Sequence, residues 1–251
     1  MFKLRGDYMT GIERRMERLF GNKGKLFLAA FDHPQIYGVT EGLEDTSSLV
    51  DSLSTSPIDG FILNPGMVNK MPAAALRNKA LVIRSSVGGT ILGTGFSTCH
   101  RQILSGIDAA RLGADAVLVM FAIGGENDIE SQVELARVCG DFHNYGIPVI
   151  AEVLANDWEK NNDTGLISCG ARIAAEIGAD CIKAFYCADF DKVTSNCPVP
   201  VILAGGPKDQ DIKSVVSEVV SKGCRGLAFG RNIFQSSDPK ATIESLDGVL
   251  R

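Results

Sequence analysis

The stretch "EIGADCIKA" (residues 176–184) ends a helical pattern at a glycine and passes through a short turn into an apolar strand. Nearly the same phrase returns in "RLGADAVLV" (111–119) and "SKGCRGLAF" (221–229), and "NYGIPVIAE" (144–152) is a looser copy. Helices commonly end at glycine, and strands covered on both faces are almost continuously apolar. The repeated phrase therefore indicates a repeated unit in which a helix leads into a buried parallel strand.

Eight apolar runs of strand length lie along the chain. They occupy residues 25–32, 60–64, 80–85, 115–121, 148–154, 180–186, 200–206 and 226–230. Helical patterns between them include residues 99–113, 128–146, 165–178 and 211–223. Eight such units predict an α/β fold, a single (β/α)8 TIM barrel over residues 1–251, with an open doubly wound sheet as the alternative. Residues 1–24 are expected to form an extra, amphipathic N-terminal helix and a lead-in to the barrel.

The composition narrows the class of protein. The chain has 251 residues, of which 45% are hydrophobic, and a net charge of -5 with no basic block, so nucleic acid is not an expected partner. No apolar run is long enough for a membrane span, and the N-terminus lacks the apolar core of a signal peptide. Seven cysteines without a CxxC pair are expected to be buried thiols in the reducing cytoplasm. Three histidines without an HExxH pattern give no support for a metal.

Several of the apolar runs contain charged residues, and three of these residues share the parity of inward-facing positions. Because side chains alternate along a strand, Asp32, Glu152 and Lys183 are each expected to point into the barrel near the mouth formed by the strand ends. Burial favours the neutral amine of a lysine, which can attack a carbonyl to form a Schiff base, and a nearby carboxylate can shuttle the protons. The alternatives are a buried ion pair without chemistry and, for Asp32, a cap of the following loop. His33 is interpreted as a polar residue of the rim.

The loops after the seventh and eighth strands form a second candidate site. They read "ILAGGPK" (202–208) and "FGRNIF" (229–234), at positions where barrels commonly bind phosphate through backbone N–H groups. Their candidate phosphate-binding residues are Gly205, Gly206, Gly230 and Arg231, with ordinary turns as the alternative. Arg84 is a candidate for a second anionic group or for a salt bridge at the rim. The glycine-rich connection 85–100 is either a flexible loop or a lid over the substrate.

Taken together, these residues resemble the class I (Schiff-base) aldolases: archaeal-type fructose-bisphosphate aldolase, deoxyribose-phosphate aldolase and tagatose-bisphosphate aldolase. The autoinducer-2-processing thiolase is also close. The stretches that carry the resemblance are "LAAFDHP" (28–34), "DCIKAFY" (180–186), "CPVPVILAGGPK" (197–208) and "GLAFGRNIFQSSDP" (226–239). The resemblance covers nearly the whole chain. It implies that Lys183 forms the Schiff base, that Asp32 assists proton transfer, that the two glycine loops bind phosphate, and that the protein is a homo-oligomer.

One position departs from the archaeal-type pattern. Where those aldolases carry a tyrosine that acts as acid or base, this chain has Leu154, which cannot move a proton. Glu152 lies on the same strand face, and "AEVLAND" (151–157) is more similar to the tagatose-bisphosphate aldolases, whose glutamate is the acid/base. Glu152 is therefore the leading candidate for that role, and Tyr186 is a further proton donor whose parity points it away from Lys183.

The sequence thus predicts a metal-independent class I aldolase that needs no cofactor and acts on a phosphorylated ketose or deoxy-ketose. One alternative keeps the lysine and the barrel but transfers an acyl group to coenzyme A, as the resemblance to the thiolase implies. Another is a phosphosugar-binding protein without turnover, which predicts binding without an imine.

Overall fold

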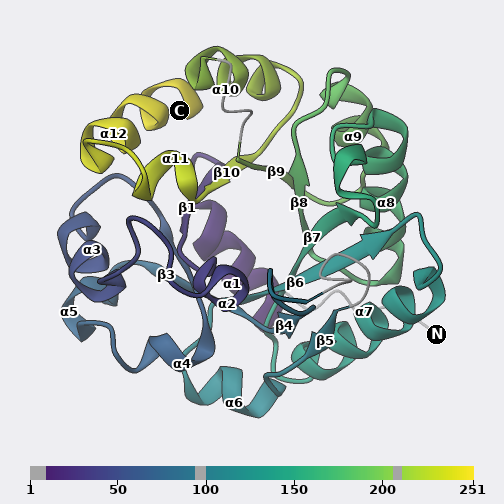
Figure 1. Cartoon of the computed structure of the whole chain (residues 1–251), viewed down its shortest axis with the longest axis horizontal. Helices are drawn as coiled ribbons and strands as arrows, with labels where there is room; N and C mark the ends of the chain where they lie inside the picture. The colour runs from purple at the N-terminus through teal and green to yellow at the C-terminus, as the bar shows by residue number, and fades with distance from the viewer. Residues whose placement is uncertain (1–9, 94–99, 206–210) are drawn as a thin grey trace.

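The apolar runs form the strands of one closed barrel. In the computed structural model, which describes residues 10–93, 100–205 and 211–251, the strands pair in parallel in the order β1-β10-β9-β8-β7-β6-β3-β2 (Figure 1). Their bounds are β1 (Leu26–Ala30), β2 (Gly60–Leu63), β3 (Ala80–Arg84), β6 (Ala116–Ile123), β7 (Val149–Ala155), β8 (Cys181–Phe185), β9 (Val201–Ala204) and β10 (Gly226–Phe229). The predicted barrel is confirmed, and the open sheet is not.

Most of the helices surround this barrel on its outer side, whereas α1 and α2 appear over its centre in the view of Figure 1. Those of eight residues or more are α1 (Gly11–Phe20), α3 (Thr46–Leu53), α7 (Asp128–His143), α8 (Thr164–Ile177), α10 (Ile212–Ser221) and α12 (Pro239–Leu250). Shorter ones are α2 (Pro34–Tyr37), α4 (Pro65–Val68), α5 (Ala73–Leu76), α6 (Gly106–Arg111), α9 (Phe190–Asn196), α11 (Arg231–Phe234) and the 3-10 helix η1 (Trp158–Lys160). None of the helices within the described ranges is both long and apolar enough to cross a membrane.

Each strand is buried on both faces because it contributes to two different cores. Inward-facing residues such as Leu28, Ile150 and Cys181 pack with one another inside the barrel, whereas outward-facing residues such as Phe27 and Ile182 pack against the helices. This alternation sets the direction of the charged side chains, because a residue two positions after an inward one also points inward. The predicted parity of the site residues therefore follows from the strand register.

Helix α1 closes the N-terminal end of the barrel. Thr10 caps it in a capping box with Glu13, which satisfies two of the N–H groups that a helix start leaves without partners. Leu19 and Phe20, at its end, are buried against the inward residues of the strands. Residues 1–9 of the predicted N-terminal helix lie outside the described residues.

The connection after β3 differs from its expected form. Residues Ser86–Val87 (β4) and Arg101–Gln102 (β5) pair as a short antiparallel ribbon, so the helix predicted over 99–113 is wrong in its first half. Helix α6 begins only after Ser105, whose hydroxyl accepts a hydrogen bond from the Asp108 N–H. The helix propensity of these residues could not reveal the ribbon, since its strands pair across about fifteen residues of the chain. Residues 94–99 are outside the described part, and the lid stays a prediction.

Candidate active site

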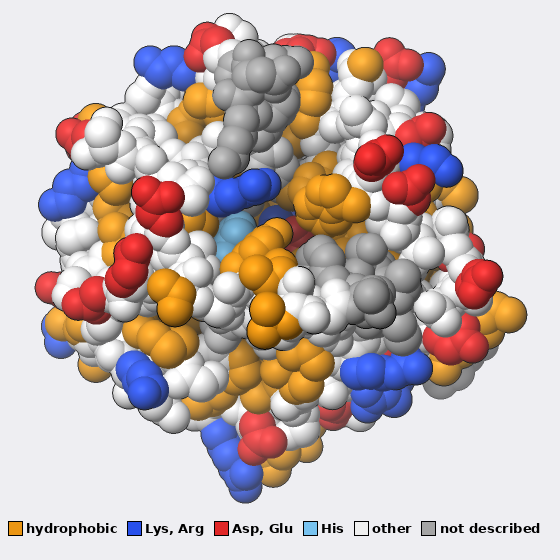
Figure 2. Space-filling model, viewed as in Figure 1, with side chains coloured by type: hydrophobic (Ala, Val, Ile, Leu, Met, Phe, Trp, Pro, Cys, Tyr) orange, Lys and Arg blue, Asp and Glu red, His pale blue; other side chains and the backbone are white. Residues whose placement is uncertain are grey.

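A cavity of about 1090 Å³ opens at the C-terminal ends of the strands, at the end of the barrel opposite α1. Figure 2 shows its mouth as a hollow near the centre of one face, with apolar and basic side chains at the edge. The residues that line it include Asp32, Arg84, Glu152, Lys183 and Arg231, which come from different strands or from the segments that follow them. The barrel thus brings these sequence-predicted residues into one cavity.

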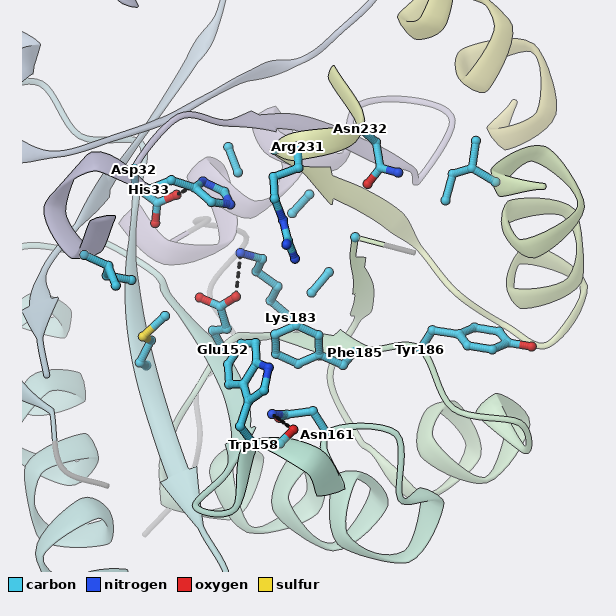
Figure 3. Close-up of a pocket in the computed structure, with 18 of the residues that line it drawn as sticks. Asp32, His33, Glu152, Trp158, Asn161, Lys183, Phe185, Tyr186, Arg231 and Asn232 are labelled. Carbon is cyan, nitrogen blue, oxygen red and sulfur yellow. Dashed lines mark hydrogen bonds and ion pairs between the residues drawn. The ribbon is translucent and has the colours of Figure 1, made fainter. Parts of the chain in front are cut away.

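Lys183 and Glu152 form the centre of this site. Parallel pairing of β7 with β8 places the two residues opposite each other, and both side chains point into the cavity (Figure 3). The Lys183 Nζ atom lies 2.7 Å from Glu152 Oε1, and each residue is only 5% exposed. The second carboxylate oxygen, Glu152 Oε2, is buried without a hydrogen-bond partner. A buried acceptor without a hydrogen bond lowers the stability of the protein. We therefore expect this oxygen to accept a hydrogen bond from a bound molecule.

Arg84 and Asp32 form a second ion pair beside the first. Arg84 Nη1 lies 2.7 Å from Asp32 Oδ2 and 3.7 Å from Glu152 Oε2, while its Nε donates to the Ser86 carbonyl. Of the two roles predicted for Arg84, the geometry shows the ion pair, located in the barrel interior rather than at the rim. The guanidinium is buried beside the carboxylates and also lines the cavity, so its role in binding an anion stays a prediction.

The two pairs balance their charges. Two carboxylates and two cations within one buried cluster compensate each other, which is the condition under which charges are tolerated away from water. Burial alone raises the pKa of Asp32, but the nearby charges of Arg84 and Lys183 outweigh it and lower that pKa to about 2. Asp32 is therefore an anion at neutral pH. Among the residues that the structure describes, no group of three or more His, Cys, Asp or Glu side chains is arranged to hold a metal ion.

The described residues of the predicted phosphate loops line another part of the cavity. Gly205 has a φ of 28° and Gly230 packs so closely on His33 that a Cβ there would lie 2.3 Å from the ring. Arg231 points into the cavity toward Lys183 (Figure 3), and its side chain makes no hydrogen bond or ion pair with any described residue. Asn232 lines the same end, and Gly206 lies outside the described residues.

An apolar wall faces this basic end. Leu154, which is fully buried, packs with Ile36 and Met120, and Phe185 contacts the same cluster. The Phe185 ring lies 5.7 Å from that of Trp158, edge to face, at the mouth. The cavity is therefore polarised in charge: Arg231 lies at one end, and the other end has apolar side chains together with Glu159, Asn161 and Asn162.

Tyr186 lies as its sequence position suggests, whereas His33 is more enclosed than its position suggests. The Tyr186 hydroxyl donates to Glu218 at 3.0 Å and points away from Lys183 (Figure 3), as its parity predicted. His33 was interpreted as a rim residue, yet it lines the cavity beside Asp32 with its side chain 21% exposed. Its position directly after Asp32 in the sequence could have indicated that it lies near the site. Its burial, however, depends on residues of α11, far away in the chain.

We expect His100 to make the stability of the protein depend on pH in the acid range. Burial, with the nearby charge of Arg84, lowers the pKa of His100 to about 3, whereas an unfolded chain has a histidine pKa near about 6.5. Because the pKa is lower in the folded protein, protons bind the unfolded chain first as the pH falls. The free energy of unfolding is therefore highest above about pH 6.5 and decreases as the pH falls toward about 3. We expect the free energy of unfolding to drop by about 2–3 kcal/mol between about pH 7 and pH 4.5 through this residue. Urea denaturation of wild type and His100→Asn should show a flatter pH dependence in the variant; parallel curves would contradict the assignment.

Comparison with known proteins places this geometry among enzymes. Residues 26–236 match the family model described as DeoC/LacD family aldolase. A 3-hydroxy-5-phosphonooxypentane-2,4-dione thiolase of Klebsiella pneumoniae subsp. pneumoniae is 33% identical over 254 residues, which covers 98% of this chain and 83% of the relative. An archaeal fructose 1,6-bisphosphate aldolase superposes with a TM-score of 0.85 at 25% identity, covering 94% of this chain and 98% of that one. A Schiff base forming fructose-1,6-bisphosphate aldolase gives 0.83 at 26% identity, covering 95% and 99%.

Proposed function

Because the chain belongs to the DeoC/LacD family of aldolases, we propose that it breaks or forms a carbon–carbon bond in a monophosphorylated ketone through a Schiff base on Lys183. The observation that carries this proposal is the contact of 2.7 Å between Lys183 Nζ and Glu152 Oε1 inside the cavity. A lysine at the centre of a large cavity, next to a carboxylate, has both the nucleophile and the proton carrier that imine chemistry requires. An ion pair without chemistry would not require the adjoining cavity.

The arrangement supports each step of imine formation. Transfer of a proton from Lys183 to Glu152 frees the amine, which attacks the substrate carbonyl and gives a carbinolamine. Glu152 then returns the proton to the carbinolamine hydroxyl, which leaves as water, and the Lys183 iminium forms. The iminium accepts the electron pair of the breaking carbon–carbon bond, so the reaction needs no external electron sink. Arg84 keeps Asp32 ionised beside these steps, and Asp32 stabilises the positive charge.

The distribution of charge supports one phosphate rather than two. Three cationic side chains line the cavity within the described residues, and two of them, Arg84 and Lys183, are paired with carboxylates. Arg231 remains to bind an anion, beside the glycines of the two loops. The opposite wall contains Ile36, Met120 and Phe185, and none of its described residues is a lysine or arginine free to pair with a second phosphate. We therefore favour a ketone with its phosphate at the Arg231 end and a short uncharged group at the other.

Acyl transfer to coenzyme A is the second candidate function. It is favoured by the 33% identity to a thiolase whose named substrate carries one phosphate group and two ketones. The same lysine and the same polarised cavity would serve it, since a diketone also forms an imine. Cys187 also lines the cavity, but burial raises the pKa of its thiol and keeps it protonated. Lys183 is therefore the proposed nucleophile in both reactions.

Borohydride trapping tests the proposal and separates the two candidates. The protein is incubated with dihydroxyacetone phosphate, glyceraldehyde phosphate, fructose 1-phosphate and fructose 1,6-bisphosphate, then reduced and analysed by intact mass and peptide mapping. We expect an adduct of substrate mass on Lys183 with a monophosphorylated ketone. Addition of coenzyme A should leave turnover unchanged for an aldolase and should be required by a thiolase. Binding of a phosphosugar without any adduct would contradict both and support a binding protein.

Replacing Arg231 with glutamine should weaken substrate binding far more than it slows the reaction. Charge-assisted hydrogen bonds contribute about 1.5–3 kcal/mol, which corresponds to about 10- to 100-fold in kcat/KM, and the loss should lie mainly in KM. The measurement is the concentration dependence of trapping with dihydroxyacetone phosphate and with unphosphorylated dihydroxyacetone. Arg172→Gln, on the outer surface of α8, is the control. An equal loss for both ligands would show that Arg231 does not bind the phosphate.

A further inference from the structure

His33 has a rigid place directly above Asp32. Its ring lies edge-on to Phe234, with centroids 5.1 Å apart, and stacks on Tyr37 at 6.3 Å. Gly230 closes the third side, since a Cβ at that position would overlap the ring. Although His33 precedes α2, its side chain makes no cap hydrogen bond. Three residues from α2 and the start and end of α11 thus hold the imidazole in one position, which a role as helix cap does not explain.

The two ring nitrogens have different surroundings. Nδ1 is buried, has no hydrogen-bond partner and lies 3.6 Å from Asp32 Oδ1. Nε2 is hydrogen-bonded to no described residue and is not among the buried atoms, so it remains open to the cavity that His33 lines. An ionised carboxylate beside Nδ1 favours the tautomer with the proton on that nitrogen, which leaves the lone pair on Nε2. Hydrogen bonds of catalytic pairs are often long before substrate binds, so 3.6 Å is compatible with this role.

The charges around His33 also favour its neutral form. Burial lowers its pKa, and Lys183 and Arg231 act in the same direction, while Asp32 and Glu152 oppose them. Lys183 lies in β8, Arg231 in α11 and Glu152 in β7, and Asp32 follows β1. A neutral imidazole with its lone pair toward the substrate space is a general base rather than an acid.

We propose that His33, oriented by Asp32, is the general base that removes the proton of the substrate hydroxyl during carbon–carbon cleavage. This inference rests on the proposed Schiff-base function and assigns a second proton carrier to the same site. Glu152 contacts Lys183 Nζ and serves the imine, whereas His33 lies on the other side of the lysine, next to the Gly230 turn (Figure 3).

The proposed step starts from a Lys183 iminium with a hydroxyl on the carbon β to the imine carbon. Nε2 takes the hydroxyl proton, and the O–H electron pair becomes the C=O bond of the departing aldehyde. The bond between the α and β carbons breaks, and its electron pair neutralises the iminium to give an enamine. The imidazolium returns its proton to the α carbon, which restores the iminium for hydrolysis by water.

Two substitutions separate basicity from shape. His33→Asn retains a polar group near Nδ1, and His33→Gln places an amide near Nε2 that can hydrogen-bond but cannot accept a proton. We expect both to lower kcat for cleavage of fructose 1-phosphate, or of whichever panel ketose the wild type cleaves, by about 10²- to 10⁴-fold. Trapping of dihydroxyacetone phosphate on Lys183 should stay within about threefold of wild type, since Glu152 is intact. His143→Asn, whose side chain pairs with Asp180 outside the cavity, is the control.

Other outcomes would overturn the inference in different ways. Near-normal cleavage by His33→Gln would show that His33 only hydrogen-bonds, and equal losses of trapping and cleavage would show that it only supports the structure. If the wild type itself forms no adduct with any ketone of the panel, the Schiff-base function fails and this inference fails with it. If the wild type is trapped normally and the His33 variants cleave the ketose normally, the role of His33 is rejected while the Schiff-base function stands.

Discussion

Lys183→Arg and Lys183→Met will both lose the borohydride-trapped adduct, and turnover will fall by on the order of 10⁵-fold, as when other covalent nucleophiles are removed. A guanidinium stays protonated and methionine has no nitrogen, so neither can form an imine. Liquid chromatography–mass spectrometry of the reduced protein measures the adduct directly. An adduct that persists on another lysine in both variants would show that Lys183 is not the nucleophile.

The two variants should differ in stability, which separates loss of chemistry from loss of folding. Arginine keeps a cation beside Glu152, so its free energy of unfolding should remain close to that of the wild type. Methionine leaves the Glu152 carboxylate with only Arg84 at 3.7 Å, and removing one partner of a buried pair costs about 3–5 kcal/mol. Denaturant unfolding of both proteins provides the comparison. Equal stabilities would mean that the Lys183–Glu152 contact contributes little to the fold.

The barrel could be predicted from the sequence because its signal is local and repeated. Each strand is buried on both faces and therefore appears as a continuous apolar run, and glycine marks the helix ends, as at Gly178 after α8. Parity then placed Asp32, Glu152 and Lys183 on the inward face without any knowledge of their neighbours. These features depend on residues a few positions apart, which a single sequence contains.

The contacts between those residues could not be predicted in the same way. The Arg84–Asp32 pair depends on the register of β1, β2 and β3, which sets how far each side chain extends into the barrel. His33 is enclosed by Phe234 and Gly230, about two hundred positions later in the chain, so its sequence neighbourhood suggested only a rim residue. The alternation of side chains along the strand was enough to predict the direction of Tyr186, because it does not depend on any other element of the fold. The sequence therefore allowed the strands and helices to be identified, but not the distances between side chains on different elements.

Glu152→Gln should slow imine formation by about 10²- to 10⁴-fold, the contribution typical of a general acid or base. The amide can still accept a hydrogen bond from Lys183 but cannot take up its proton, so both freeing the amine and expelling water are impaired. The rate of adduct formation with dihydroxyacetone phosphate, quenched by borohydride at successive times, is the measurement. This result would be the reverse of that expected for His33→Gln, in which trapping is normal and cleavage is slow.

A matched control exists on α7, outside the cavity. Glu134 is also buried, accepts a hydrogen bond from the Gln102 N–H at 2.6 Å and pairs with Arg137. Glu134→Gln should lower stability without changing the rate of trapping, which separates the loss of a buried carboxylate from the loss of the proton carrier. Asp32 is a poor substitute for Glu152, because a pKa of about 2 leaves almost no protonated form at neutral pH. A Glu152→Gln enzyme that forms the adduct at the wild-type rate would therefore require a proton carrier outside the two buried ion pairs.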